Sequence, residues 1–444
     1  MLKAGMTRVD ITPPQGLCLM GFPHYPRHNT GAHDPLYAAC MYLDNGKTEI
    51  AMVTLDLLYF SKRYVTEVRK RVFERCGIPT ANVMISCSHT HSGPMAAGST
   101  DPDDLLKGDN RPDEYIEVLI EKISNTICEA KEGAYEAYFA SGAAVCGAES
   151  GVGGNRRVRG GPHDPMVSVM AIKDTASNIR GAMVNYALHP TFIHEWSTVC
   201  TADYPCYLKI EMEERAPGML VGFAQGASGN QSSRYYRKGE SYDEAERVGR
   251  TLGKAAFSVL EKAEWRSNFE IKTASESMPI ETRSFGTEEE LEKIVAHDKA
   301  VYEELYAKYG KSEKREEYYL WQNANLRHLG SEKQLMFTKL INSGMRIPML
   351  EDETPTEIQA FDIGGTCVIG MQGEIFVEYG LFIKAMAPYG LVIVNELTNG
   401  CHPGYMYTPE SLITGGYETG NSLLAEGFGK HMVDKVLETL GKIK

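Results

Sequence analysis

His89 and His91 stand one residue apart in the segment Ser-Cys-Ser-His-Thr-His-Ser-Gly-Pro at 86–94. On an extended segment alternate side chains share a face, so both imidazoles can point the same way. Neutral imidazole is a good zinc ligand, and the small, tight-turn residues around the pair leave room for a metal ion and its water. The pair therefore predicts part of a metal site, and a pair of surface or capping histidines is the alternative.

A third histidine, His189, follows another apolar run in the segment Asn-Tyr-Ala-Leu-His-Pro-Thr at 185–191. Alone it would be a capping histidine before a proline. Together with His89 and His91 it gives three imidazoles, and catalytic zinc sites commonly use three protein ligands plus a water. We therefore expect the three side chains to meet around one divalent ion.

Two aspartates are candidates for orienting these histidines, because a ligating histidine usually donates its other N–H to a carboxylate or carbonyl. Asp56 ends an apolar strand next to the strand that leads to His89. Asp203 precedes a Tyr-Pro pair, where its alternative role is the N-cap of the next helix.

The segments that must position these residues alternate between strand and helix patterns. Residues 48–57 predict a buried strand, residues 61–76 a helix ending at Gly77, and residues 82–87 a second strand that leads into the histidine pair. This order indicates a crossover unit of an α/β sheet, in which ligand sites lie beyond the strand ends. Further strands are expected at 138–145, 166–172, 181–188, 219–224, 366–370 and 391–397, and further helices at 112–131, 204–214, 243–262, 374–386 and 422–440.

The composition changes at about 264–343, where the chain is charged and rich in Glu, Lys and Tyr. Exposed helices are expected at 288–309 and 313–329. We interpret this stretch as a helical insertion in a single large α/β catalytic domain, with mixed sheets and flanking helices, that spans residues 1–444.

The overall composition restricts the classes of function. Of the 444 residues 43% are hydrophobic and 24% charged, as in ordinary globular proteins, and the net charge of -13 disfavours nucleic acid as a partner. The sequence has no apolar stretch of the roughly 20 residues that a transmembrane segment needs, and no signal-like apolar run, so a cytoplasmic protein is expected. Ten scattered cysteines without a Cys-x-x-Cys pair argue against a thiolate zinc site. An oligomer is possible.

Taken in order, the motifs resemble those of the neutral (non-lysosomal) ceramidase catalytic domain, and the resemblance covers nearly the whole chain. The metal loop at 86–94 is its most specific part and the serine loop around Ser232 the least. The matching segments are 4–14, 86–94, 154–157, 185–191, 223–232, 373–374 and 405–420.

This resemblance implies a set of zinc ligands and catalytic groups. The implied ligands are His89, His91, His189, Glu374 and Tyr405. Tyr417 would donate its hydroxyl to the oxyanion, and Arg156 would polarise or orient the substrate carbonyl, because preorganised donors aimed at developing charge are a large catalytic contribution. The alternatives are a first-turn helix glutamate for Glu374, and Arg157 or Arg159 as the inward arginine.

Ser232 keeps the family's spacing of three residues after a glycine, but its neighbours Asn230 and Ser233 differ from the family's acidic residue and proline. Ser232 is therefore expected to contact a substrate hydroxyl, to act as a nucleophile, or to cap the helix that follows.

The sequence thus predicts a zinc-dependent, ceramidase-like hydrolase that cleaves an amide (N-acyl) or ester bond by metal-activated water. The expected substrate is a small-molecule or lipid-like N-acyl compound. Ceramidases often carry an export signal and an extra C-terminal β-domain, and neither is seen here, so a soluble amide, ester or lactone unrelated to sphingolipid is the alternative. A non-catalytic metal- or ligand-binding relative is a rival. A two-metal phosphoesterase is another, but the histidine pair lacks the expected aspartate partner nearby.

Overall fold

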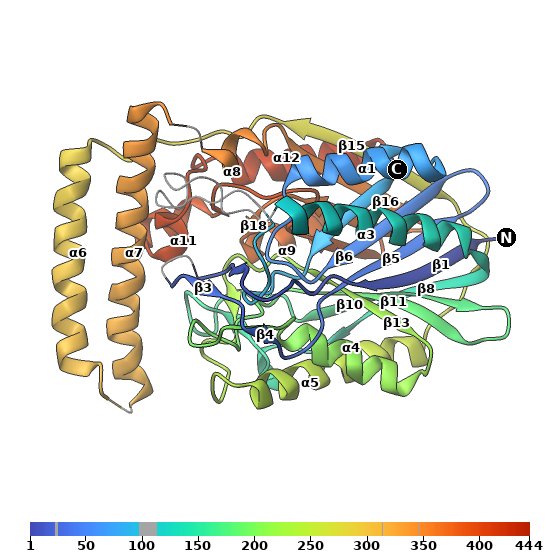
Figure 1. Cartoon of the computed structure of the whole chain (residues 1–444), viewed down its shortest axis with the longest axis horizontal. Helices are drawn as coiled ribbons and strands as arrows, with labels where there is room; N and C mark the ends of the chain where they lie inside the picture. The colour runs from blue at the N-terminus through green and yellow to red at the C-terminus, as the bar shows by residue number, and fades with distance from the viewer. Residues whose placement is uncertain (23–24, 97–112, 313, 346) are drawn as a thin grey trace.

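Two β-sheets form the centre of the computed structural model, which describes residues 1–22, 25–96, 113–312, 314–345 and 347–444 (Figure 1). The first sheet contains, in spatial order, β13 (Leu220–Gln225), β11 (Ile179–Tyr186), β10 (Met166–Asp174), β8 (Tyr135–Val145), β1 (Lys3–Asp10), β5 (Tyr37–Asp44), β6 (Glu49–Leu55) and β7 (Val83–Cys87). The second contains β15 (Ile271–Met278), β16 (Thr356–Ile363), β17 (Thr366–Met371) and β19 (Leu391–Asn395).

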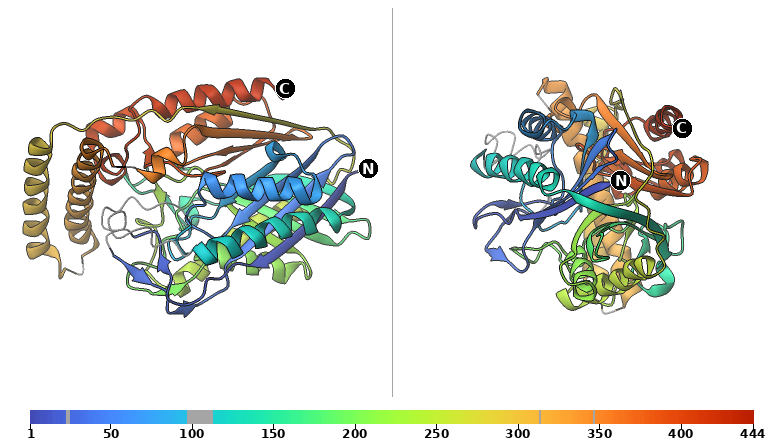
Figure 2. Two further views of the ribbon diagram at one scale, coloured as in Figure 1. Left: turned by 45° about the horizontal axis from the view of Figure 1, so that its top comes forward. Right: turned by 90° about the vertical axis from the view of Figure 1, so that its right-hand side faces the viewer.

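A buried apolar cluster joins the two sheets, because strands of both contribute to it. Met41 and Phe139 come from the first sheet, and Phe361 and Val368 from the second. Helices cover the outer faces (Figure 2). The first sheet packs against α1 (Lys62–Cys76), α3 (Asp113–Glu132), α4 (Tyr204–Arg215) and α5 (Tyr242–Glu261), and the second against α9 (Val377–Met386) and α12 (Phe428–Gly441). The result is a four-layer α/β/β/α arrangement, which confirms the expected mixed α/β fold class.

Three strand pairs in these sheets are parallel, and each pair is connected through a helix. They are β6 and β7 through α1, β11 and β13 through α4, and β17 and β19 through α9. The crossover predicted before the histidine pair is therefore present. Because ligand sites of such units lie beyond the carboxyl ends of the strands, a ligand site is expected in the segments after β7, β11 and β17.

The first sheet coils strongly, so that β13 contacts β6 and β7 although β13 and β7 are its opposite edges. Gly222 on β13 permits this approach, since a Cβ atom there would lie 2.5 Å from Thr54 Oγ1 of β6. The carboxyl ends of β7 and β11, which lie at the two sides of the sheet, are thereby brought near one another.

The charged stretch contains two long helices at one end of the molecule, with α7 between α6 and the rest of the fold (Figure 1). Helix α6 (Glu288–Tyr309) has the predicted bounds, whereas α7 (Arg315–Ser343) is longer than expected. Residues 271–278, within the same stretch, form β15 of the second sheet. Helix α7 contacts α11 (Tyr417–Gly420), and the other short helices are α8 (Pro348–Glu351) and α10 (Pro409–Thr414).

Several two-residue strands hold the loops at the carboxyl ends of the main strands. They form the pairs β2 (Cys18–Leu19) with β3 (Arg27–His28), β4 (Gly31–Ala32) with β12 (Val199–Cys200), β9 (Gly154–Asn155) with β14 (Gln231–Ser232), and β18 (Glu374–Ile375) with β20 (Tyr405–Met406). The expected helix at 374–386 is therefore wrong at its start, because Glu374 lies in β18 and α9 begins at Val377. Among the described helices, none has the length and apolar character needed to cross a bilayer.

Candidate metal centre

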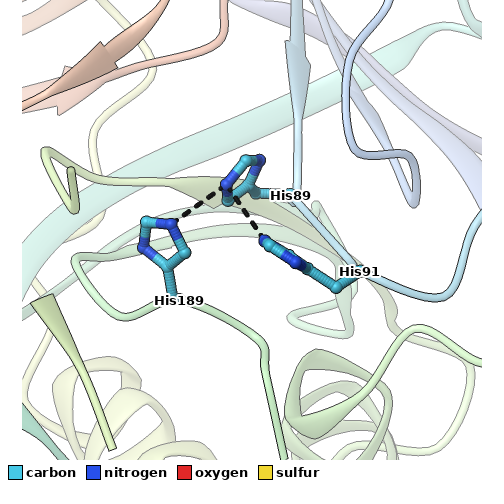
Figure 3. Close-up of side chains that lie close together, drawn as sticks. All are labelled: His89, His91 and His189. Carbon is cyan, nitrogen blue, oxygen red and sulfur yellow. Dashed lines mark hydrogen bonds between the residues drawn. The ribbon is translucent and has the colours of Figure 1, made fainter. Parts of the chain in front are cut away.

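The three predicted histidines converge although they come from two distant loops (Figure 3). His89 Nε2 lies 3.2 Å from His189 Nε2 and 3.4 Å from His91 Nε2. One nitrogen from each of the three rings lies within 4.8 Å of the others. Burial lowers the pKa of His189 to about 3 and the pKa of His91 well below its usual value, so both imidazoles are neutral at pH 7. This cluster could hold a metal ion.

Glu374 adds a carboxylate to the cluster. Its Oε2 lies 3.1 Å from His189 Nε2 and 3.4 Å from His89 Nε2. Burial would raise the pKa of Glu374, but the neighbouring histidines outweigh burial and hold it well below its usual range. The Tyr59 hydroxyl donates to Oε1, which leaves Oε2 facing the imidazoles. Gly373, at a φ of 80°, makes the turn that brings Glu374 here, and a Cβ atom there would lie 2.4 Å from His402 Nδ1.

Four of the six separations among these ligand atoms are close to what a tetrahedral metal site requires. With zinc–nitrogen bonds of about 2.0–2.1 Å, two ligand atoms at tetrahedral corners lie about 3.3 Å apart. His89 Nε2 lies 3.2 to 3.4 Å from the facing atoms of His189, His91 and Glu374, and Glu374 Oε2 lies 3.1 Å from His189 Nε2. Neutral imidazoles and one carboxylate also suit a divalent cation chemically, so the residues fit the predicted metal.

Backbone geometry fixes the two histidines of the first loop. His89 follows β7 and has a φ of 66°, a left-handed conformation that is strained for a non-glycine residue. Its Nδ1 lies 3.3 Å from the carbonyl oxygen of Leu58. His91 packs against Gly21, where any Cβ atom would lie 2.6 Å from the histidine. The first loop therefore depends on contacts with segments that precede it in the chain.

His189 is oriented by a serine and a glutamate that the sequence reasoning missed. Its Nδ1 lies 3.1 Å from Ser228 Oγ, and Ser228 donates to Glu396 Oε1 at 2.5 Å. Glu396 is fully buried at the end of β19, and burial raises its pKa well above the usual value. A glutamate that ends an apolar strand, in residues 391–397, was the available sequence signal.

The two aspartates expected beside the histidines have other partners. Asp56 Oδ2 accepts from Lys209 Nζ at 2.6 Å and from the Tyr37 amide at 2.8 Å. None of its described hydrogen bonds involves a histidine. The predicted contact between Asp56 and a histidine is therefore wrong, because the Asp56 carboxylate binds the buried Lys209 instead.

Asp203 is the N-cap of α4, which was its alternative role, and accepts from the Tyr204 amide at 2.6 Å. It also accepts from the amides of Phe192 and Ile193, both at 2.9 Å. It thus supports the loop that follows His189 rather than the imidazole itself. Burial, opposed by these hydrogen bonds, raises the pKa of Asp203 to about 6.

The other predicted site residues lie around the same point. Tyr405 pairs with Glu374 across β18 and β20, and its ring lies 6.1 Å from that of Tyr417 and 5.5 Å from the Arg156 guanidinium. Burial and Glu374 raise the pKa of Tyr417 to about 12, so its hydroxyl remains protonated. Arg156 Nε donates to Glu418 Oε1 at 2.8 Å.

Arg156, Arg157 and Arg159 differ in their surroundings. Arg157 also donates to Glu418 and reaches the carbonyl oxygen of Gly415, whereas Arg159 is exposed. Among the three, only Arg156 lines a cavity that reaches the metal centre. The shared carboxylate of Glu418, next to Tyr417 in sequence, was not anticipated.

Ser232 lies in β14 beside the arginine loop. Its Oγ accepts from the Arg234 amide at 3.2 Å, and it is only 5% exposed. The next helix, α5, begins at Tyr242 with Ser241 as its N-cap, so Ser232 does not cap it. Gln231 accepts from the His189 amide through its carbonyl, which ties this loop to the metal centre.

Two cavities meet at the metal centre and share Phe22, Tyr25, His91, Tyr405 and Tyr417. The first cavity, of about 190 Å³, is called the apolar cavity after Leu19, Leu58, Met95, Phe337 and Met349, although Lys333, Glu374 and Asn421 line it too. The arginine cavity, of about 240 Å³, is lined by Arg156, Ser232, Arg234, Arg237, Trp321 and Gln322 among others. Helix α7 contributes to both, so it covers the site.

Two solved structures have the same architecture as this chain. The structure superposes on neutral ceramidase from Pseudomonas aeruginosa with a TM-score of 0.72 at 18% sequence identity, covering 99% of this chain and 74% of that one. A ceramidase complexed with C2 gives a TM-score of 0.74 at 17% identity, with the same coverage. No protein-family model matches the chain. The fold is thus that of the neutral ceramidases, as the sequence motifs predicted.

Proposed function

We propose that this protein, which has the neutral ceramidase fold, is a zinc-dependent hydrolase of an amide bond in an N-acyl compound. The observation that carries the proposal is the cluster of His89, His91, His189 and Glu374 at the junction of two cavities. Tyr405 would complete the ligands, since it pairs with Glu374 across two short strands. The whole chain would act as one catalytic domain, with α6 and α7 as its helical cover.

The residues around the cluster would perform separate tasks. A bound zinc ion lowers the pKa of water to about 7 and so supplies a nucleophile at neutral pH. Tyr417 would donate its protonated hydroxyl to the carbonyl oxygen as negative charge develops there, and Arg156 would add a fixed positive charge. The Glu418 carboxylate holds the Arg156 guanidinium through Nε, and the carbonyl oxygen of Gly229 accepts from its Nη2 at 2.7 Å.

Ser232 is proposed as a substrate contact rather than a nucleophile. A nucleophilic serine needs an adjacent general base. The described hydrogen bond of Ser232 Oγ is with a backbone amide, and no described imidazole or carboxylate is bonded to it. The hydroxyl lines the arginine cavity and can bond a polar group of the substrate there.

The cavities favour a compact substrate over a long lipid. An apolar cavity of about 150 Å³ accommodates benzene, so the apolar cavity of about 190 Å³ would take a short acyl chain. An N-acyl substrate with its carbonyl at the cluster would place the acyl group in this cavity and the amine portion in the arginine cavity. Ceramide itself remains a substrate to be tested beside soluble amides and esters.

The test is a metal analysis of the purified protein together with the variant His91→Ala. We expect one zinc per chain in the wild type, and in the variant a loss of bound zinc with a fall in turnover of more than about 100-fold, because even outer partners of metal ligands are worth about 10–100-fold. His297→Ala, an exposed histidine on α6, is the matched control and should keep both. Near-normal zinc and turnover in His91→Ala would refute the ligand assignment.

The substrate class is tested by comparing a fluorescent ceramide analogue with a panel of soluble amides and esters. We expect soluble N-acyl compounds to be cleaved faster than the lipid. Turnover of the ceramide analogue alone would indicate a ceramidase. No turnover of the ceramide analogue or of any soluble amide or ester would refute the hydrolase proposal.

A further inference from the structure

The arginine cavity has a charge arrangement that the hydrolysis of a neutral amide does not require. Three arginines line it in a chain whose net charge is -13. Arg156 is paired with Glu418, and Arg237 with Glu240. Arg234 differs from both, because no described carboxylate forms an ion pair with it.

The contacts of Arg234 are with neutral groups. Its Nη2 donates to Gln322 Oε1 and to Asn323 Oδ1 of α7, both at 2.8 Å. The rings of Tyr235 and Tyr319 lie 5.7 and 5.2 Å from its guanidinium. Its Nε is buried and has no hydrogen-bond partner among the described residues. The guanidinium is therefore held against α7 by two neutral side chains, and no carboxylate of the described residues is paired with it.

A second buried donor in the same cavity also lacks a partner. Trp321 lines the cavity, and its indole N–H has no acceptor in the part of the chain that the structure describes. Buried donors are normally satisfied, so two unsatisfied donors lining one cavity indicate a missing acceptor. A buried unpaired charge is costly, and burial lowers the pKa of Arg234 accordingly. An acceptor oxygen at each of these donors would supply the missing hydrogen bond.

The charged side chains that line the cavity, His194 aside, are the three arginines and the two carboxylates of Glu195 and Glu418, which is an excess of one positive charge. Glu195 accepts from His194 Nδ1 at 2.9 Å, and His194 Nε2 faces Arg237 Nη1 at 2.9 Å. One unpaired guanidinium therefore matches a monoanion. A carboxylate is such a group and fits the planar fork of arginine, whereas a phosphate monoester carries about -1.5 to -2 at pH 7.

We propose that the arginine cavity binds a carboxylate of the substrate through Arg234, with Trp321 as a second donor, so that the protein hydrolyses N-acyl compounds whose amine portion is anionic, such as N-acyl amino acids. This inference rests on the proposed function and names the substrate class for the same site. In the reaction water adds across the acyl C–N bond, the acyl carbon gains the hydroxyl, and the leaving nitrogen gains the proton. The products are a carboxylic acid and a free amino acid.

The activity test uses two substrates that differ only in the charge of the amine portion, N-hexanoyl-leucine and N-hexanoyl-leucinol. Release of the free amine is measured with the holoenzyme. We expect a higher kcat/KM for the carboxylate in the wild type. In Arg234→Met, kcat/KM for the carboxylate should fall about 10- to 100-fold more than kcat/KM for the alcohol, as expected for a lost charged hydrogen bond. Arg234→Lys should retain part of the preference.

Arg159→Met is the matched control, because Arg159 is an exposed arginine on the neighbouring loop. It should keep the wild-type ratio of the two kcat/KM values. Circular dichroism and zinc content show whether each variant is folded and loaded. An equal ratio of kcat/KM values in the wild type and Arg234→Met would overturn the carboxylate site while leaving the amide hydrolase intact.

A binding measurement separates this inference from the proposed function. The ligand is a ketone analogue of N-hexanoyl-leucine in which a methylene replaces the amide nitrogen, and calorimetry gives its Kd. We expect tighter binding than for the matching alcohol and the matching phosphate ester, and a Kd at least about tenfold higher in Arg234→Met. This result without any turnover would support the site and refute the hydrolase. Tighter binding of the phosphate ester, or equal binding by both proteins, would refute the carboxylate site.

Discussion

The hydroxyl of Ser228 bears on the tautomer and ring orientation of His189 in the candidate metal centre. Its Oγ contacts His189 Nδ1, Glu396 and the Gln225 side-chain amide, all within 3.1 Å. A partner on the distal nitrogen fixes the tautomer and the ring orientation of a metal-binding histidine. Because Gln225 ends β13 and Glu396 directly follows β19, the hydroxyl connects the two sheets at the point where the metal would bind.

The variant Ser228→Ala should therefore weaken zinc binding without unfolding the protein. We expect the zinc Kd to rise about 10–100-fold, the usual effect of removing an outer partner of a metal ligand. Competition with a chromophoric chelator measures the constant. Ser233→Ala is the control, since Ser233 is a buried serine whose hydroxyl makes no hydrogen bond with any described residue. Equal zinc affinity in the two variants would mean that His189 is held by its backbone alone.

The individual residues of the site differ in how far the sequence could identify them. His89 and His91 were identifiable because they stand one residue apart directly after an apolar strand. Asp56 has the same kind of strand-end position, yet it pairs with Lys209, which comes from a helix far along the chain. Ser228 and Tyr59 act through contacts between distant segments, and no local pattern marks such contacts.

At the scale of elements, α7 controls the shape of the site through a close crossing with α11. Gly330 of α7 and Gly420 of α11 face each other, and a Cβ atom on Gly420 would lie 2.6 Å from Gly330 Cα. Tyr417, the proposed oxyanion donor, begins α11. The two glycines thus allow the helical cover to sit directly on the element that carries a catalytic side chain.

Gly420→Ala should separate α7 from α11 and move the Tyr417 hydroxyl. We expect kcat to fall, with zinc content unchanged, and the free energy of unfolding to drop by about 1–3 kcal/mol, as for other overpacked sites. Steady-state kinetics and urea denaturation measure the two quantities. In the control Gly441→Ala, the added Cβ meets no heavy atom within 4 Å and both should stay near wild type. A normal kcat in Gly420→Ala would remove α11 from the mechanism.

The elements themselves were predicted better than their arrangement. Hydrophobic periodicity and the stop at Gly77 gave α1, and the capping Thr287 begins α6 where the pattern indicated. The start of α9 was missed because Glu374 follows a left-handed Gly373 and pairs with β20 instead of continuing into a helix. The meeting of opposite sheet edges at Gly222 depends on sheet coiling, which strand patterns do not encode.

At the scale of the whole molecule, the candidate metal centre forms only if two halves of the first sheet come together. The half that carries His89 packs on α1 and α3, and the half that carries His189 packs on α4 and α5. Lys209 of α4 reaches Asp56, which directly follows β6, and both residues are at least 95% buried. This ion pair is a direct polar contact between the two halves.

Lys209→Met should consequently destabilise the fold rather than the metal site. Removing one partner of a buried ion pair leaves an uncompensated charge and costs about 3–5 kcal/mol, which urea denaturation would measure. The double variant with Asp56→Leu should recover much of this loss because no charge is then left unpaired. Lys293→Met, which breaks an exposed pair with Glu289 on α6, should change stability by less than about 1 kcal/mol. Zinc content per folded chain should stay constant in all of them, because none of the described hydrogen bonds of Asp56 involves a histidine. Loss of zinc at normal stability in Lys209→Met would instead restore Asp56 to the role that its position at the strand end first suggested.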